Sequence, residues 1–317
     1  MRIDCHVHAF PSATDHAARL PASAAALLSG LPGSSLATVA RALEVGRHLG
    51  IDTGRLAAFR HQTPGPVHQV AEFLMSLGMG PALLLVGTLD RLRDSMRRAG
   101  VDRSVVIAAP PLATNDWLLR AVAADPALVP VAHVPPVPIG APADAWRQAY
   151  EDLAERGARG FKLHPNMDDL TPEHPAVRAA LDCARAHGRF VILHTGRFTV
   201  PGYRNLRPAD PRDWADVLRA YPDVRVCLAH MNRDAPEVVW PLLTELPRLY
   251  TDTSWQPADA IRRAVEAVGP ERLLLGSDWP LLHLDFQTEA VGELEQGAGI
   301  AAAARIAGDS ARAFLGE

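Results

Sequence analysis

Eight short runs of apolar and β-branched residues recur along the chain, and seven of them follow one another closely after residue 100. Runs that are apolar almost throughout are typical of strands in a parallel sheet that helices cover. Eight strand–helix units predict an α/β fold, a closed (β/α)8 TIM barrel. An open doubly wound sheet is the alternative, but no Gly-x-Gly-x-x-Gly motif follows the first run. The expected strands are residues 2–8, 101–109, 127–134, 157–164, 189–195, 224–230, 248–254 and 272–278.

Segments with helical periodicity fill the intervals between these runs. Several of them end at glycine, as the C-termini of helices prefer. The segments that read as helices include residues 90–100, 143–157, 175–188, 213–221, 236–246 and 257–269.

One interval is far longer than a barrel connection. About 90 residues separate the first two strands, and only the last of them are needed as the first barrel helix. The remainder, roughly residues 10–86, is an insertion expected to be helical in part. Insertions of this length are usually functional or disordered. Because this one follows a barrel strand, we expect a lid that shapes the substrate site. A dimerisation element, and with it a homodimer, is the alternative. The chain is expected to form one domain, residues 1–317, that includes this insertion.

Charge and composition exclude several classes of partner. The net charge of −4, the pI near 6.3 and the scattered basic residues give no footprint for nucleic acid or an anionic membrane. No apolar run reaches the roughly 18 residues that span a bilayer. The first residues read as a strand rather than a signal peptide, and Cys5, Cys183 and Cys227 lack CxxC spacing. We therefore expect reduced cysteines, a cytoplasmic location and a small-molecule substrate.

Histidines and one acid mark the ends of five predicted strands. The chemistry of a TIM barrel collects at these C-terminal ends. Residues two apart on a strand face the same side, so His6 and His8 can converge on one ion, and Lys162 and His164 share an orientation. Imidazole and carboxylate are good ligands for Zn²⁺ and similar ions. The residues at these ends are His6, His8, Lys162, His164, His194, His230 and Asp278.

The strand-end pattern leaves open the roles of two further residues, Asp4 and His133. Asp4 is suited either to orient a metal-binding imidazole or to face solvent. His133 ends the third predicted strand, and the sequence gives it no partner.

These motifs together resemble the amidohydrolase superfamily, and within it the amidohydrolase-2 group of metal-dependent barrel enzymes. The resemblance covers nearly the whole chain outside residues 10–86. It rests on five motifs in barrel order and on the C-terminal DSARAFLGE. The motifs are IDCHVH (3–8), GFKLHP (160–165), ILHTG (192–196), CLAHM (227–231) and LLGSDWP (274–280).

The resemblance implies a ligand set. His6, His8 and Asp278 would hold a divalent metal, most simply Zn²⁺ with Mn²⁺ as an alternative. In members with one ion, His194 completes the site and His230 is catalytic. In members with two ions, a carboxylated lysine bridges them, here Lys162, and His194 and His230 bind the second ion.

Lys162 is the only lysine in the chain, which otherwise uses arginine. A carbamate needs a neutral amine, which a buried lysine can provide and arginine cannot. As an ammonium, Lys162 would instead contact the substrate or take a catalytic role. The third alternative is a structural ion pair with Asp252 or Asp278.

The implied activity is hydrolysis of an amide, ester or lactone. The metal lowers the pKa of a bound water toward about 7. Asp278 would move the proton, and His230 or Lys162 would stabilise the oxyanion.

Several residues near the barrel mouth are expected to contact the substrate. His164 would meet it one step nearer the mouth than Lys162. Arg197 is suited to bind a carboxylate, and loop residues Arg204 and Arg207 are weaker candidates. Trp279 and Trp255 would either form a wall of the site or pack under a loop.

A metal-dependent decarboxylase or other lyase acting on a small carboxylic acid is the main alternative function. A non-catalytic descendant is disfavoured because the ligand set is complete.

Overall fold

A computed structural model of the chain describes residues 1–12, 87–138, 140–142, 144–198, 209–296 and 300–317. It confirms the predicted barrel, because eight strands form one sheet in which each strand pairs in parallel with the next along the chain. The strands are β1 (Ile3–His8), β2 (Arg103–Ile107), β3 (Leu128–His133), β4 (Gly160–Leu163), β5 (Phe190–His194), β6 (Arg225–Ala229), β7 (Leu249–Asp252) and β8 (Leu273–Leu274).

The barrel is closed by backbone hydrogen bonds between β1 and the chain that follows β8. The Cys5 N–H donates to the Leu275 carbonyl over 2.7 Å, and the Asp278 N–H donates to the His6 carbonyl over 2.7 Å. Each observed strand lies within its predicted range but is shorter. The difference is largest at β8, after which Leu275 and Asp278 bond to β1 as irregular backbone.

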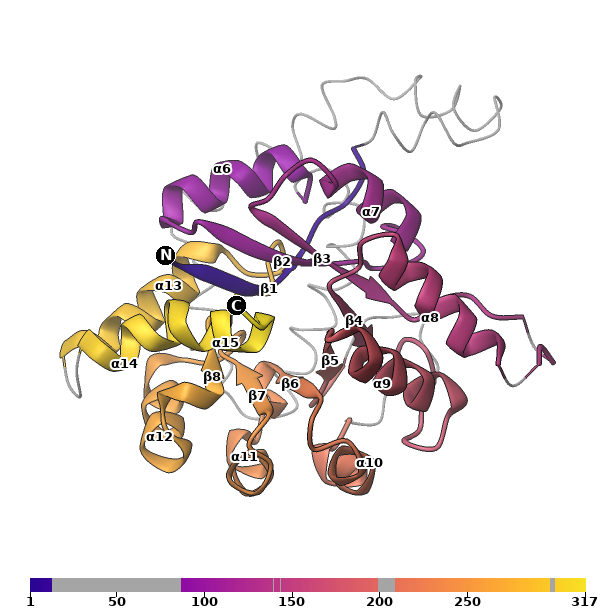
Figure 1. Cartoon of the computed structure of the whole chain (residues 1–317). Coiled ribbons are helices and arrows are strands. Elements are labelled where there is room, and N and C mark those ends of the chain that lie inside the picture. Colours follow the sequence, from indigo (N-terminus) through magenta and orange to yellow (C-terminus); the bar gives the residue numbers. More distant parts are fainter. Residues whose placement is uncertain (13–86, 139, 143, 199–208, 297–299) are drawn as a thin grey trace.

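Helices surround the strands (Figure 1). Thr88 and Thr114 begin α6 and α7 by accepting a hydrogen bond from a backbone N–H of the first turn. The α-helices after residue 87 are α6 (Leu89–Ala99), α7 (Asn115–Val122), α8 (Ala145–Glu155), α9 (Pro175–His187), α10 (Ala215–Ala220), α11 (Trp240–Glu245), α12 (Ala258–Val268), α13 (Leu284–Gly292), α14 (Ile300–Ala304) and α15 (Ser310–Leu315).

The C-terminal helix α15 fills one end of the barrel interior. Phe314 packs on Phe190 and Tyr250, with ring centroids 4.6 and 5.3 Å apart. These two rings belong to the first halves of β5 and β7. The end of the barrel at which the strands begin is therefore apolar and closed. The polar side chains lie at the opposite end, where the strands finish.

A bulge in β1 sets the direction of its histidines. Asp4 pairs with Ser104 and Val7 with Val106, so Cys5 and His6 together oppose the single residue Val105. Bulges bend a strand and re-aim its side chains, often next to active sites. Cys5 joins the apolar interior, while Val7 packs between strands and helices.

The predicted insertion at residues 10–86 lies almost entirely outside the described residues. Among the helices that the structure does describe, none combines the length and apolar character of a membrane span.

Candidate metal centre

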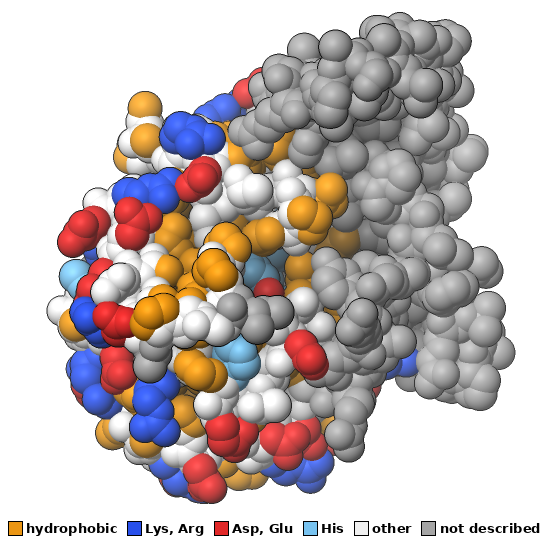
Figure 2. All heavy atoms as spheres, turned by 90° about the vertical axis from the view of Figure 1, so that its right-hand side faces the viewer, with side chains coloured by type: hydrophobic (Ala, Val, Ile, Leu, Met, Phe, Trp, Pro, Cys, Tyr) orange, Lys and Arg blue, Asp and Glu red, His pale blue; other side chains and the backbone are white. Residues whose placement is uncertain are grey.

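The residues predicted at the strand ends lie around one end of the barrel. His8 and His194 are the last residues of β1 and β5, and Lys162 is inside β4. His164 and His230 follow β4 and β6 directly, and Asp278 lies four residues beyond β8. On the face shown in Figure 2, histidine side chains and an acidic one are visible at a depression bordered by hydrophobic side chains. All seven side chains, including that of His6, are largely buried.

His6, His8 and Asp278 form the first candidate ligand set. One ligand atom from each lies within 4.8 Å of the other two. Oδ1 of Asp278 is 3.3 Å from His8 Nε2 and 3.7 Å from His6 Nε2. His8 Nδ1 is 3.1 Å from the Ile107 carbonyl, which only accepts hydrogen bonds, so the proton is on Nδ1. The Nε2 lone pair of His8 therefore faces Asp278.

Asp252, at the end of β7, orients His6 in the same manner. Its Oδ2 is 2.8 Å from His6 Nδ1, with both side chains buried. A carboxylate at Nδ1 holds the proton there and leaves Nε2 as the metal ligand. Burial lowers the pKa of the His6 imidazole, and the neighbouring Lys162 lowers it further, against the effect of Asp252. Neutral imidazole is the form that binds metals.

The Asp252 carboxylate is almost fully engaged by hydrogen bonds. Its Oδ1 accepts from the backbone N–H of His230 at 3.2 Å and from both the N–H and the hydroxyl of Ser254. Burial acts to raise the pKa of Asp252, but His6 and Ser254 outweigh it and hold that pKa below its usual value. Gly276 makes room for this carboxylate, since a Cβ there would lie 2.9 Å from Cβ of Asp252.

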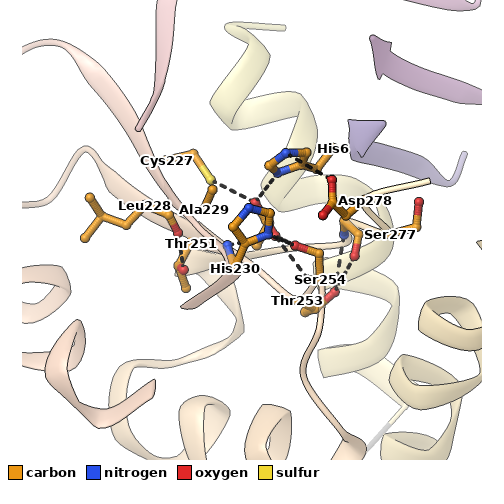
Figure 3. A network of polar contacts seen from close by, with 12 residues as sticks. His6, Cys227, Leu228, Ala229, His230, Thr251, Thr253, Ser254, Ser277 and Asp278 are labelled. Carbon is orange, nitrogen blue, oxygen red and sulfur yellow. Dashed lines mark hydrogen bonds and ion pairs between the residues drawn. The ribbon is translucent and has the colours of Figure 1, made fainter. Parts of the chain in front are cut away.

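Asp252 also reaches His230 through Ser254. His230 Nδ1 is 2.6 Å from the Ser254 hydroxyl oxygen, whose hydrogen is donated to Asp252 (Figure 3). The hydroxyl has one hydrogen, so His230 Nδ1 must donate and Nε2 carries the lone pair. The ring centroids of His6 and His230 are 4.6 Å apart. His230 therefore presents an unprotonated nitrogen beside the first ligand set.

One ligand atom from each of His6, His230 and Asp252 also lies within 4.8 Å of the other two. The hydrogen bonds of Asp252 account for this proximity, because its oxygens already bind His6, Ser254 and the His230 backbone. We interpret this group as the support for His6 and His230 rather than as a second ion site.

His194 and His164 stack on each other, with ring centroids 4.0 Å apart and planes 10° from parallel. His194 Nε2 is buried and has no hydrogen-bond partner among the described residues. An unpaired buried nitrogen beside His230, whose ring centroid is 4.9 Å away, fits a metal ligand. His164 differs, because its Nδ1 accepts from the Met167 N–H at 3.2 Å and its proton must be on Nε2.

Lys162 lies between the metal ligands and the β3–β4 side of the barrel. Its Nζ is 3.4 Å from His6 Nε2, and the side chain is 2% exposed. Burial lowers the pKa of Lys162 to about 8, against the charges of Asp252 and Asp278. The amine is therefore close to the range in which the neutral form is available.

Backbone strain collects at the same place. His230, Trp255 and Asp278 adopt φ values of 63°, 65° and 60°. Residues with side chains rarely take this left-handed conformation, and such outliers cluster at functional sites. Trp255 donates its indole N–H to Oδ2 of Asp278 over 2.6 Å. Burial acts to raise the pKa of Asp278, but the interactions with His8, His6 and Trp255 hold it below its usual value.

The predicted substrate contacts remain predictions. Arg197 Nε lies 3.0 Å from Oδ2 of Asp234, so its guanidinium already has one carboxylate partner. Trp279 is 4% exposed and packs with Val7 and Phe10 in an apolar cluster. Arg204 and Arg207 lie outside the described residues.

Sequence reasoning gave Asp252 only a possible ion pair with Lys162 and did not single out Ser254. The one available signal was the position of Asp252 close to the C-terminal end of the seventh predicted strand, residues 248–254.

The donor set fits a divalent ion. Hydrogen bonds at Nδ1 fix His6 and His8 with both Nε2 lone pairs toward Asp278 Oδ1, and His194 Nε2 is left unpaired. Two or three imidazoles and a carboxylate form the ligand set of catalytic zinc and related ions.

Solved structures share the fold at low sequence identity. The chain is 16% identical to 5-carboxyvanillate decarboxylase from Sphingomonas paucimobilis, with a TM-score of 0.58 over 74% of this chain and 86% of that one. It is 16% identical to a manganese-bound dihydroxybenzoic acid decarboxylase from a Polaromonas species, with a TM-score of 0.58 over 75% and 90%. It is 22% identical to a protein described as a 2-pyrone-4,6-dicarboxylic acid hydrolase from Pseudomonas putida, with a TM-score of 0.53 over 73% and 88%.

No curated protein sequence matches the chain significantly. The family model described as Amidohydrolase matches residues 3–316, nearly the whole chain. The chain therefore belongs to the amidohydrolase family and is a metal-dependent enzyme built on a TIM barrel.

Proposed function

We propose that the enzyme is a hydrolase that uses one divalent ion to cleave an amide, ester or lactone bond in a small molecule. The observation that carries this proposal is the convergence of His6 Nε2, His8 Nε2 and Asp278 Oδ1, with the Nε2 lone pair of His230 beside them. This arrangement provides both a metal site and a separate base.

The side chains of the site have two roles, binding the ion and accepting a proton. His6, His8, Asp278 and His194 would hold the ion, which supplies an activated water and polarises the carbonyl. His230 would take the proton from the attacking water at Nε2 and return it to the leaving group, because the Ser254–Asp252 pair holds Nδ1 protonated and stabilises the resulting imidazolium. This assignment moves the proton-accepting role from Asp278, expected from the sequence, to His230.

Lys162 acts in this proposal as an ammonium that stabilises the developing oxyanion. It lies 3.4 Å from the His6 nitrogen and is buried, so its charge acts in a poorly screened environment. The carboxylated, two-ion form is the alternative for the same residue.

Zn²⁺ is the ion we propose, with Mn²⁺ as the alternative, because a His-rich set with one carboxylate suits both. We further propose a small-molecule substrate and a cytoplasmic location. All three cysteines are buried and unpaired, as a reducing compartment favours.

A metal-dependent decarboxylase is the second candidate, and one observation favours it. Trp255 engages Oδ2 of Asp278 while Oδ1 faces His8 and His6, so the carboxylate has no oxygen left to act as a base. Decarboxylation needs no base that deprotonates water, so this arrangement of Asp278 is compatible with it.

Metal analysis of protein purified without chelator, followed by two substrate panels, tests the proposal. Lactones, esters and amides are assayed for acid release, and hydroxylated aromatic acids are assayed for CO2. Acid release that Asp278→Asn abolishes and that surface variant His187→Gln retains supports hydrolysis. CO2 release alone selects the decarboxylase, and protein without a divalent ion contradicts both.

A further inference from the structure

His133, the last residue of β3, has a buried imidazole that the proposed reaction does not use. The residue is 3% exposed, and neither ring nitrogen has a hydrogen-bond partner among the described residues. A buried polar group without a partner lowers stability, so native proteins rarely keep one without a reason.

The backbone of His133 is, in contrast, held on both sides. The side-chain amide of Asn115 donates to the His133 carbonyl over 2.9 Å and accepts from the His133 N–H over 2.7 Å. Asn115 begins α7 and is itself buried. Hydrogen bonds to the backbone therefore fix the position of the His133 ring, while its two nitrogens make no hydrogen bond. This arrangement suits a residue that contacts a bound ligand.

Asp168 lies beside this ring. Its Oδ1 is 3.5 Å from His133 Nδ1, and its Oδ2 is buried without a partner. Burial raises the pKa of Asp168 to about 7 and lowers that of His133 to about 3. No hydrogen bond joins the two groups, so both nitrogens of the neutral His133 ring stay available for a ligand.

Two more donors belong to the same side of the barrel. His164 carries its proton on Nε2, because Nδ1 accepts from the Met167 N–H, and its ring centroid is 6.5 Å from that of His133. Lys162 is the register partner of His133 across β3 and β4, so the two side chains point to the same face of the sheet.

We propose that His133 and His164 form a subsite that binds a carboxylate group of the substrate, on the face of the sheet that also carries the charge of Lys162. One full positive charge and two neutral N–H donors match a monoanion with two oxygens better than a phosphate dianion, whose second charge would stay unpaired. The proposal rests on the proposed function, because this carboxylate would belong to the molecule whose reacting group lies at the metal.

Calorimetric titration of the full chain with benzoate, and with benzamide as its uncharged counterpart, tests the subsite. Each titration is done on Zn²⁺-loaded and on EDTA-treated protein. We expect benzoate to bind the EDTA-treated chain more tightly than benzamide does. His133→Leu should weaken benzoate about 10- to 100-fold, as the loss of a hydrogen bond to a charged group does. His133→Gln, which keeps a donor, should retain part of the affinity, and the exposed His187→Leu should change nothing.

Thermal unfolding of the same variants separates a ligand contact from a structural histidine. Replacing an unpaired buried polar ring by an apolar side chain should leave the melting temperature of His133→Leu unchanged or higher. A variant that melts lower and binds benzoate as before overturns the proposal. Benzoate binding that requires Zn²⁺ and ignores His133→Leu assigns the anion to the metal and overturns it too, as does equal binding of benzamide.

Should the leucine variant not fold, imidazole ¹⁵N shifts of the wild-type chain decide the question. Benzoate must move the signals of a buried neutral histidine, and unchanged signals overturn the proposal. Because binding to the EDTA-treated chain needs neither metal nor turnover, its outcome is independent of whether the enzyme is a hydrolase.

Discussion

Trp255 donates its indole N–H to Oδ2 of Asp278 over 2.6 Å, so Oδ1 is the oxygen that faces His8 and the metal site. The tryptophan holds this position at a φ of 65°, and the Arg233 guanidinium lies 4.4 Å above its ring. A strained backbone and a cation stacked on the ring both restrict the indole. The sequence indicated either a substrate wall or packing under a loop for Trp255, and the structure gives it a direct hydrogen bond to a candidate metal ligand.

Trp255→Phe should therefore weaken metal affinity about tenfold. This is the low end of the loss that follows when a hydrogen-bond partner of a metal ligand is removed. Phenylalanine keeps most of the ring but removes the N–H, so Asp278 loses one of the interactions that hold its pKa low. Competition for Zn²⁺ with a fluorescent chelator measures the change. Trp240→Phe is the matched control, because the Trp240 indole nitrogen has no partner among the described residues. Equal retention in both variants would contradict the role of Trp255.

Asp252→Asn should weaken the metal site about 10- to 100-fold. An asparagine that turns its NH₂ toward His6 Nδ1 forces the proton onto Nε2, which removes the ligand lone pair. Metal content after dialysis measures this effect, with the exposed Asp259→Asn as the control. A variant that retains its ion as the parent does would show that Asp252 does not set the His6 tautomer.

Ser254→Ala should separate the two functions of Asp252. The hydroxyl connects Asp252 to His230 only, while His6 contacts the carboxylate directly. We expect a fall in kcat with unchanged metal content, because His230 loses the acceptor that keeps Nδ1 protonated. Loss of the ion in Ser254→Ala would instead place His230 among the metal ligands, as in a two-ion site.

Burial of Asp4 should make stability depend on pH. Burial raises the pKa of Asp4 from 3.8 to about 7, although the N–H groups of His6 and Ser277 lower it. The folded chain therefore binds more protons than the unfolded chain between these values, and stability falls as pH rises from about 4 to 7. In Asp4→Asn this decline should be smaller by an amount of the order of a few kcal/mol. Urea unfolding of EDTA-treated protein across this range measures it, with Asp216→Asn as the control.

The fold was predictable because each strand is an apolar run bounded by turns, and periodicity depends on local residues only. The positions of His6, His8, His194, His230 and Asp278 followed from the rule that barrel chemistry lies at strand ends. The bulge in β1 was not predictable, because it depends on how Cys5 and His6 pair with a distant strand.

The supporting bonds were also hidden from the sequence. The hydrogen bonds that connect Asp252, Ser254 and His230 join β7 to the segment after β6. The hydrogen bond from the Asn115 side chain to the His133 backbone joins α7 to β3. Such contacts arise only when the barrel closes, and no local pattern records them. Trp279 illustrates the same point, because its position after β8 suited a substrate wall while its side chain packs against β1.

Lys162→Met should stabilise the metal-free chain at pH 7 and abolish turnover. Burial lowers the pKa of the lysine from 10.5 to about 8, so the folded chain binds fewer protons than the unfolded chain between these values. Stability of the wild type should therefore rise as pH increases from about 8 to 10, and methionine should remove that rise. Urea unfolding at pH 7 and pH 10 measures the gain in stability and the loss of its rise with pH.

The one-ion proposal requires one ion per chain in wild type and variant alike. Two ions in the wild type, fewer in Lys162→Met and a ¹³C carbamate signal after incubation with labelled bicarbonate would contradict it and establish Lys162 as a carboxylated bridge.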